Sequence, residues 1–228
     1  MTTDSTLTYM GHMSFLWHTA SGRRVLIDPF QQPDRGSWFV IEYPVTDVDA
    51  VLVTHDHFDH NAIDRVSHNA RRITEPGEYD LTGVRILGLQ DQHNASRSAI
   101  VMRNVIYMIE IGGIRFCHIG DNRADSPAET LTQIGEVAVL SLPVDDSVHL
   151  HTFEQTAQVI ASIDPLIVIP SHYHNEGVTD VASTLLTVTR WLSEQKHVRM
   201  VGNSTVQLDR DALPTKREIW VFEAALSP

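Results

Sequence analysis

Short apolar runs separated by polar turns fill the first half of the chain, a pattern typical of β-strands. Strands are predicted at residues 6–10, 15–19, 24–28, 50–54, 84–89, 104–111 and 114–118. Ser21 and Gly22 form a turn signal between the second and third runs, so the first three strands should make an antiparallel meander. The run at residues 50–53 is apolar throughout and should be a buried strand.

Helical and strand patterns alternate in the second half. Helices are predicted at residues 126–134, 153–163 and 179–195, and strands at residues 137–142, 166–170, 198–201 and 219–222. The longest helix is expected because apolar residues recur there every three to four positions, at Val181, Leu185, Val188 and Leu192. A meander followed by β–α alternation predicts an α/β fold, a four-layer αββα sandwich. No repeat or linker divides residues 1–228, which are interpreted as one domain.

Charge and composition narrow the function. The 17 basic and 29 acidic residues give a net charge of −12, which repels nucleic acids and anionic membranes, so neither is expected as a partner. No apolar stretch is long enough to span a membrane, and residues 1–6 do not resemble a secretory signal. The single cysteine, Cys117, excludes an internal disulfide and is expected in a buried strand. A cytoplasmic protein is predicted.

Histidines gather in one segment. The 13 histidines include three in the six residues His55-Asp56-His57-Phe58-Asp59-His60, directly after the predicted buried strand. Imidazole is the commonest metal ligand in proteins. Alternate residues of an extended segment point the same way, so His55 and His57 can converge on one cation, while Asp59 and His60 can serve a neighbouring one.

These residues have the His-x-His-x-Asp-His form of the metallo-β-lactamase superfamily. The flanking segments Gly-His-Met-Ser-Phe at 11–15 and Arg-Val-Leu-Ile-Asp-Pro at 24–29 resemble the ascorbate-6-phosphate lactonase-like branch, which includes uncharacterised metal-dependent hydrolases. The segment 118–121, His-Ile-Gly-Asp, resembles the element of the family that supplies a bridging carboxylate. The segment 169–173, Ile-Pro-Ser-His-Tyr, resembles its last histidine motif. The resemblance spans roughly residues 8 to 175.

The resemblance implies seven ligands for two divalent metal ions. It assigns His55, His57 and His93 to one ion. It assigns Asp59, His60 and His172 to the other, with Asp121 bridging the two. A surface loop histidine is the alternative for His93, and a turn aspartate is the alternative for Asp121. Zinc suits these nitrogen and oxygen ligands best, and manganese or iron also fits them.

The sequence allows more than one role for three further histidines and one loop. His12, His118 and His174 could orient ligands, contact substrate or be structural. The loop at residues 31–43, with Trp38, Phe39 and Tyr43, could form a wall of the substrate pocket or pack in the core. Exposed sheet edges and the predicted C-terminal helix leave formation of a homo-oligomer open.

The resemblance implies hydrolysis. Two neighbouring cations lower the pKa of a shared water and polarise a carbonyl or phosphoryl oxygen, with Asp59 as the residue that assists the attacking hydroxide. The expected substrate is a small-molecule ester, lactone or phosphorylated metabolite. The alternatives are a phosphodiesterase or nuclease, and a non-catalytic metal-containing binding protein. A redox di-iron role is disfavoured because the oxygen-reducing members of the superfamily carry a glutamate where His57 stands.

Overall fold

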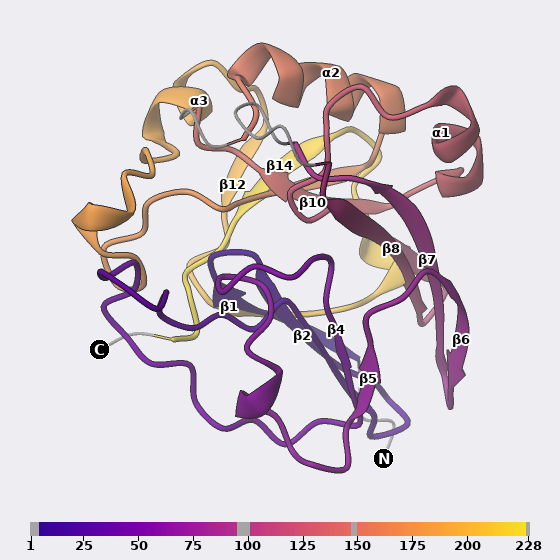
Figure 1. Ribbon diagram of the computed structural model, residues 1–228. Helices are drawn as coiled ribbons and strands as arrows, with labels where there is room; N and C mark the ends of the chain where they lie inside the picture. The colour runs from indigo at the N-terminus through magenta and orange to yellow at the C-terminus, as the bar shows by residue number, and fades with distance from the viewer. Residues whose placement is uncertain (1–4, 95–100, 147–149, 227–228) are drawn as a thin grey trace.

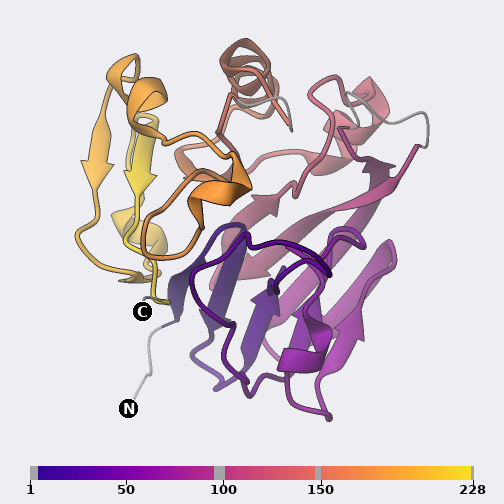
Figure 2. The same ribbon diagram turned by 60° about the vertical axis from the view of Figure 1, so that its left-hand side comes forward.

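The computed structural model describes residues 5–94, 101–146 and 150–226 and consists of two facing β-sheets with helices over one of them (Figures 1 and 2). The strands are β1 (Thr6–Gly11), β2 (Ser14–His18), β3 (Arg24–Ile27), β4 (Ala50–Leu52), β5 (Arg71–Ile73), β6 (Gly77–Leu81), β7 (Val84–Gln92), β8 (Arg103–Ile111), β9 (Ile114–His118), β10 (Val139–Pro143), β11 (Ile167–Ser171), β12 (Val198–Met200), β13 (Thr205–Gln207) and β14 (Glu218–Val221). The six-stranded sheet has the order β13-β1-β2-β3-β4-β5. The eight-stranded sheet has the order β12-β14-β11-β10-β9-β8-β7-β6.

Strand direction decides where the loops meet. The predicted meander is confirmed, because β1, β2 and β3 pair antiparallel, whereas β4 pairs parallel to both β3 and β5. In the second sheet β9, β10, β11 and β14 run parallel. The carboxyl ends of parallel strands meet at one edge of a sheet, and ligand sites in such sheets are found outside that edge. The loops that follow β9, β10 and β11 therefore emerge together.

Three hydrophobic clusters pack against the faces of the two sheets. Successive residues of a strand point to opposite faces, so each sheet contributes one face to a shared core that includes Phe15 and Tyr107. The outer face of the eight-stranded sheet packs in a second cluster with residues of the helices, such as Ile160 and Trp191. The outer face of the six-stranded sheet packs in a third cluster with Phe30. This layering confirms the predicted α/β sandwich of two sheets.

The helices are unevenly distributed. They are α1 (Ala128–Ile134), α2 (Phe153–Ile163) and α3 (Thr189–Ser193), with 3-10 turns η1 (Ile63–Arg65), η2 (Val181–Ser183) and η3 (Arg210–Ala212). All three α-helices lie over the eight-stranded sheet, at the top of Figure 1. A capping box between Thr152 and Gln155 begins α2. The six-stranded sheet is covered by the loop between β3 and β4 and by η1, where the four-layer prediction expected helices.

The predicted helix at residues 179–195 is wrong. The segment contains only η2 and α3, separated at Thr184, whose φ of 61° is left-handed and incompatible with a continuing helix. Val181 is 83% exposed, whereas Leu185 and Val188 are buried, so the apolar spacing does not define a single buried face. The structure also contains β5, β6 and β13, which the sequence patterns did not predict. Among the described residues, no helix has the length and apolarity needed to cross a membrane.

Candidate metal centre

The candidate ligands come from loops at one edge of the two sheets. The motif of three histidines and two aspartates follows β4, and the other residues follow β1, β7, β9 and β11: His12, His93, Asp121 and His172. Both His12 and His172 have a positive φ, 54° and 56°. The backbone N–H of His172 donates to the carbonyl oxygen of His12 at 3.0 Å. This hydrogen bond joins the first loop of one sheet to the last motif of the other.

The side chains form two groups whose potential ligand atoms lie within 4.8 Å of one another. The first group is His55, His57, His93 and Asp121. The second group is His12, Asp59, His60 and His172. The structure thus brings together all seven residues that the sequence predicted, in the predicted division, and adds His12 to the second group. We call these groups the His55 half-site and the Asp59 half-site.

Asp121 lies between the half-sites. Its Oδ2 is 3.7 Å from Nε2 of His55 and 3.5 Å from Nε2 of His93. Its Oδ1 is 3.4 Å from Nε2 of His60, and its Oδ2 is 3.6 Å from Nε2 of His172. A carboxylate with histidines of both half-sites on its two oxygens has the geometry needed to bridge two cations.

Unpaired buried atoms test whether these residues fit metal ions. Nε2 of His60, Nε2 of His93, Nε2 of His172 and Oδ1 of Asp121 are buried and make no hydrogen bond to any described residue. Buried polar atoms without partners are rare in native proteins, because each costs about 1–3 kcal/mol. All four belong to the two half-sites and are common metal-ligand atoms. Divalent cations would satisfy them together, so the residues fit the metal ions that the sequence predicts.

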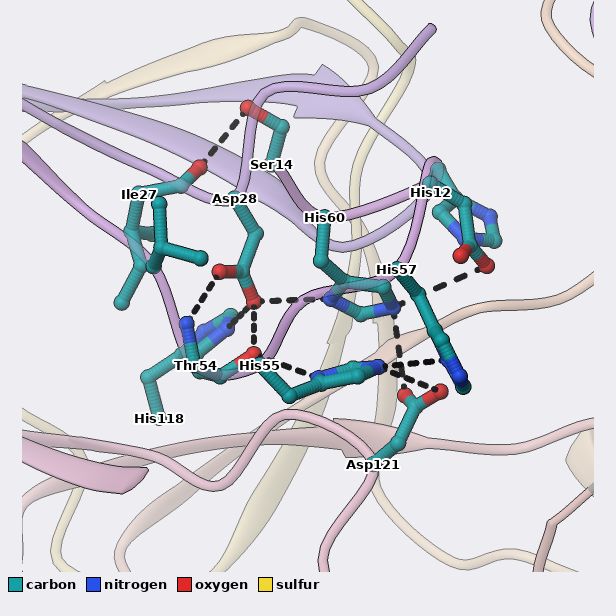
Figure 3. A network of polar contacts seen from close by, with 12 residues as sticks. His12, Ser14, Ile27, Asp28, Thr54, His55, His57, His60, His118 and Asp121 are labelled. Carbon is teal, nitrogen blue, oxygen red and sulfur yellow. Dashed lines mark hydrogen bonds and ion pairs between the residues drawn. The ribbon is translucent and has the colours of Figure 1, made fainter. Parts of the chain in front are cut away.

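A buried network behind the ligands determines which nitrogen each histidine presents (Figure 3). The hydroxyl of Thr54 donates to Oδ2 of Asp28 at 2.8 Å and therefore accepts from Nδ1–H of His55, 3.0 Å away. Oδ2 of Asp28 also accepts from Nδ1–H of His60 at 2.9 Å. In their neutral forms, both histidines therefore carry the proton on Nδ1 and direct Nε2 toward the site as the free ligand atom. Such outer hydrogen bonds orient metal-binding histidines in many metalloproteins.

Asp28 has further partners that hold it in place. It accepts hydrogen bonds from the backbone N–H of Thr54 at 2.9 Å and from Nε2 of His118 at 2.9 Å. Nδ1 of His118 in turn lies 2.7 Å from the hydroxyl of Ser141. Burial alone would raise the pKa of Asp28, but His60 and His118 lower it far below its ordinary value. Asp28 is therefore a buried carboxylate that stays ionised.

A second carboxylate stands behind the last histidine motif. Oδ2 of Asp145, in the loop after β10, lies 3.7 Å from Nδ1 of His172, and Asp145 is 1% exposed. Burial favours the neutral form of His172, but Asp121, Asp145 and Asp59 outweigh it and raise its pKa to about 10. In the His55 half-site, burial dominates and lowers the pKa values of His55 and His57. The two half-sites therefore differ in electrostatic character.

The three histidines whose roles the sequence left open have different surroundings in the structure. His12 is fully buried, and its Nε2 lies 3.2 Å from Oδ2 of Asp59 in the Asp59 half-site. Burial and the nearby His172 lower the pKa of His12 to about 4, so it is neutral and donates this hydrogen bond. His118 supports Asp28 and belongs to neither half-site. His174 is outside both half-sites and has Nδ1 3.1 Å from the hydroxyl of Thr179.

The loop at residues 31–43 divides between core and surface. Phe39 and Tyr43 are each 2% exposed and pack with Phe30, so for them the core interpretation is correct. Trp38 is only partly buried, and its ring lies 5.3 Å from that of Phe58, which is also partly buried. Phe58 stands between the ligands of the motif. This aromatic pair is thus beside the metal centre.

Sequence reasoning assigned no role to Thr54, Asp28 or Asp145. Asp28 and Thr54 end the two apolar runs that become neighbouring parallel strands, a signal that points to proximity but not to a function. No sequence signal relates Asp145 to His172. Cys117 is a buried residue of β9, as predicted, and burial raises its pKa to about 12. It is not part of either half-site.

Comparison with known proteins agrees with this geometry. A model of the beta-lactamase superfamily domain matches residues 6–172, which include every residue of both half-sites. The chain belongs to the metallo-beta-lactamase superfamily. A superfamily structure from Thermotoga maritima superposes with a TM-score of 0.75 and 26% identity, covering 96% of this chain and 98% of that one.

Two curated proteins are similar to this chain over about three quarters of its length. A UPF0173 protein of Pyrococcus furiosus is 28% identical over 197 residues, which cover 76% of this chain and 86% of the relative. A protein of Thermococcus onnurineus named a UPF0173 metal-dependent hydrolase is 22% identical over 191 residues, covering 73% of this chain and 83% of the relative. The specific resemblance to ascorbate-6-phosphate lactonases stays a prediction.

Proposed function

We propose that this chain, a metal-dependent hydrolase of the metallo-beta-lactamase superfamily, uses two divalent metal ions to cleave a small-molecule ester or lactone. The observation that carries the proposal is the position of Asp121, with its two oxygens 3.4–3.7 Å from histidines of both half-sites. The unpaired buried nitrogens that surround it support the same interpretation. Zinc suits these donors best, and manganese or iron would also be accepted.

Bound divalent ions would supply an acidified water and would polarise the carbonyl oxygen of the substrate. The protein contributes a base and its orientation. Oδ2 of Asp59 accepts from Nε2 of His12 and lies 3.4 Å from Nε2 of His172. Asp59 would help to hold one ion and would accept the proton of the attacking water. His12 donates to Asp59 and so keeps that carboxylate turned toward the centre.

Charge favours an uncharged substrate. The carboxylates in or behind the half-sites are Asp28, Asp59, Asp121 and Asp145. Their four negative charges equal the four positive charges of two divalent ions, so a loaded site has little attraction left for a dianion. The partly exposed ring pair of Trp38 and Phe58 adds an apolar surface beside the motif. An ester or lactone with an apolar group therefore fits better than a phosphorylated metabolite.

The deciding experiment combines metal analysis with turnover. Purified protein is analysed for metal content, then assayed on uncharged aryl esters, lactones and a bis-aryl phosphodiester before chelation, after chelation, and after reloading with Zn²⁺ or Mn²⁺. The proposal requires two ions per chain and ester or lactone cleavage that chelation abolishes and reloading restores. Faster cleavage of the phosphodiester would favour the phosphodiesterase alternative. Two bound ions without turnover of any substrate would favour a metal-containing binding protein.

A further inference from the structure

The two half-sites support their histidines in different ways. In the Asp59 half-site, the nitrogen of His60 that faces away from the centre is 2.9 Å from Asp28. The corresponding nitrogen of His172 is 3.7 Å from Asp145. In the His55 half-site, the outer nitrogen of His55 donates to the neutral hydroxyl of Thr54. Carboxylates therefore stand behind two histidines of one half-site, and an uncharged group stands behind a histidine of the other.

Both supporting carboxylates are fixed in the interior. Asp28 is 0% exposed, accepts from both the backbone and the hydroxyl of Thr54, and has a left-handed φ of 45°. That conformation is unfavourable in a residue other than glycine and persists only where surrounding contacts impose it. Asp145 is 1% exposed and follows β10, the central neighbour of β9 and β11. Neither carboxylate belongs to a ligand group, so both are available to act through the histidines.

The half-sites also differ in charge and burial. A cation in the Asp59 half-site would contact Asp59, share Asp121, and have Asp28 and Asp145 behind its histidines. A cation in the His55 half-site would contact only one carboxylate, Asp121. All four residues of the Asp59 half-site are buried, whereas His57 and His93 of the other are partly exposed. Charge attraction is stronger and solvent competes less where burial is complete.

We infer that the Asp59 half-site binds its metal ion first and more tightly, and that the ion of the His55 half-site exchanges with solution. Carboxylates behind metal-binding histidines raise the basicity of the ligand and strengthen binding. The inference rests on the two-ion site of the proposed function and adds a form of regulation. Hydrolysis would depend on the free concentration of the second, exchangeable ion, while the first remains bound.

Stepwise loading with Co²⁺ tests the inference. Metal-free protein is titrated at pH 8, with calorimetry measuring the dissociation constants and visible absorption reporting the ligand environment of each ion. Wild-type protein should show two events whose constants differ at least tenfold. His93→Ala should eliminate the weaker event and keep the tighter one. Asp145→Asn should weaken the tighter event by roughly 10- to 100-fold and change the weaker one little.

A matched control accounts for loss of a carboxylate as such. Asp49→Asn removes a carboxylate that pairs with Arg23 outside both half-sites, and it should leave both constants unchanged. Circular dichroism confirms that each variant is folded. The inference fails if His93→Ala removes the tighter event, if Asp145→Asn weakens only the weaker event, or if the two constants are equal. Ordered binding of two ions without ester or lactone cleavage would overturn the proposed function and leave this inference standing.

Discussion

The side chain of Thr54 occupies the space that a Cβ atom on residue 120 would need. An ideal Cβ built on Gly120 would lie 2.6 Å from Oγ1 and 2.7 Å from Cβ of Thr54. Thr54 is the residue that connects His55 to Asp28. Gly120 immediately precedes Asp121, the carboxylate between the half-sites. The absence of a side chain at Gly120 therefore lets the loop that carries Asp121 pack directly against Thr54.

Gly120→Ala should consequently disturb both half-sites. Its added methyl group must displace Thr54 or Asp121, so we expect metal affinity to fall at least tenfold. Gly112→Ala is a matched control, because Gly112 has a similar φ of +60° but no atom within 4 Å of the position of its Cβ. The left-handed backbone should cost each variant about 1–2 kcal/mol of unfolding free energy, and Gly120→Ala should lose more. Urea unfolding and metal titration measure both effects; equal losses in the two variants would contradict the steric argument.

His12 should act on turnover through Asp59. His12→Ala removes the donor to Oδ2 of Asp59 and should lower kcat by roughly 10- to 100-fold, as expected for loss of a group that orients a metal ligand. His12→Gln can still donate from its amide and should recover part of that loss. Both variants place a side chain other than glycine at the same positive φ, so their backbone strain is equal. A purely structural role predicts that the two variants lose kcat equally.

Asp59→Asn should abolish most turnover without unfolding the protein. The amide has the shape of the carboxylate but cannot accept a proton, so kcat/KM should fall by about 10²- to 10⁴-fold. Asp56→Asn is the control in the same loop, because Asp56 is exposed and accepts a hydrogen bond from Asn61 outside both half-sites. Kinetics, thermal melting and metal analysis are compared for both variants. A near-normal rate in Asp59→Asn with its metals bound would rule out the assigned role.

The sequence predicted the candidate metal ligands better than the buried residues that hold those ligands in place. The ligands in the motif come from a contiguous pattern, and the two-sheet fold follows from strand periodicity and β–α alternation. By contrast, His118 and Asp28 are 90 positions apart, and only the packed sheets bring them together. Local patterns contain no signal for such pairs. The sequence left the role of His12 open, because the direction of its side chain depends on a left-handed backbone conformation that hydropathy does not indicate.

The failed prediction of a helix at residues 179–195 has a similar cause. Apolar spacing at Val181, Leu185 and Val188 matches a helical period, but spacing alone does not distinguish one buried face from separate contacts. Asp180 caps the start of η2 by accepting from the backbone N–H of Ala182, so the first turn forms as the spacing predicts. Thr184 then adopts a left-handed conformation. Tertiary contacts of the loop outweighed a pattern that was only partly amphipathic.

Trp38 should govern selectivity for the apolar part of the substrate. Trp38→Ala removes one ring of the pair with Phe58, so KM should rise with acyl length in an ester series, by roughly 10- to 100-fold for the longest chains. The KM for the acetate ester should change least. Trp220→Ala is the control, because Trp220 is partly buried on β14 and stacks with Arg199. Steady-state kinetics over the series decides; an equal effect on every acyl length would contradict a role in substrate selection.

Metal binding to the Asp59 half-site should release protons. In the metal-free protein, burial opposes the charged form of His172, but Asp121 and the other carboxylates raise its pKa to about 10. The pKa of His60 is raised by the same kind of contacts. An ion can bind only to the unprotonated nitrogen, so at least one proton should leave at pH 8. His55 and His57, whose pKa values are lowered, are already neutral and should release none.

The same shifts determine the pH dependence of affinity and stability. A pKa that is higher in the folded protein stabilises it fully below the unfolded value of about 6.5, and this stabilisation is lost as the pH rises through about 10. Metal-free protein should therefore lose stability over that range, while affinity for the first ion should increase and affinity for the second should stay nearly constant. Calorimetry in buffers of different ionisation enthalpy counts the released protons. Equal proton release in both events, or an affinity for the first ion that does not change with pH, would contradict the electrostatic difference between the half-sites.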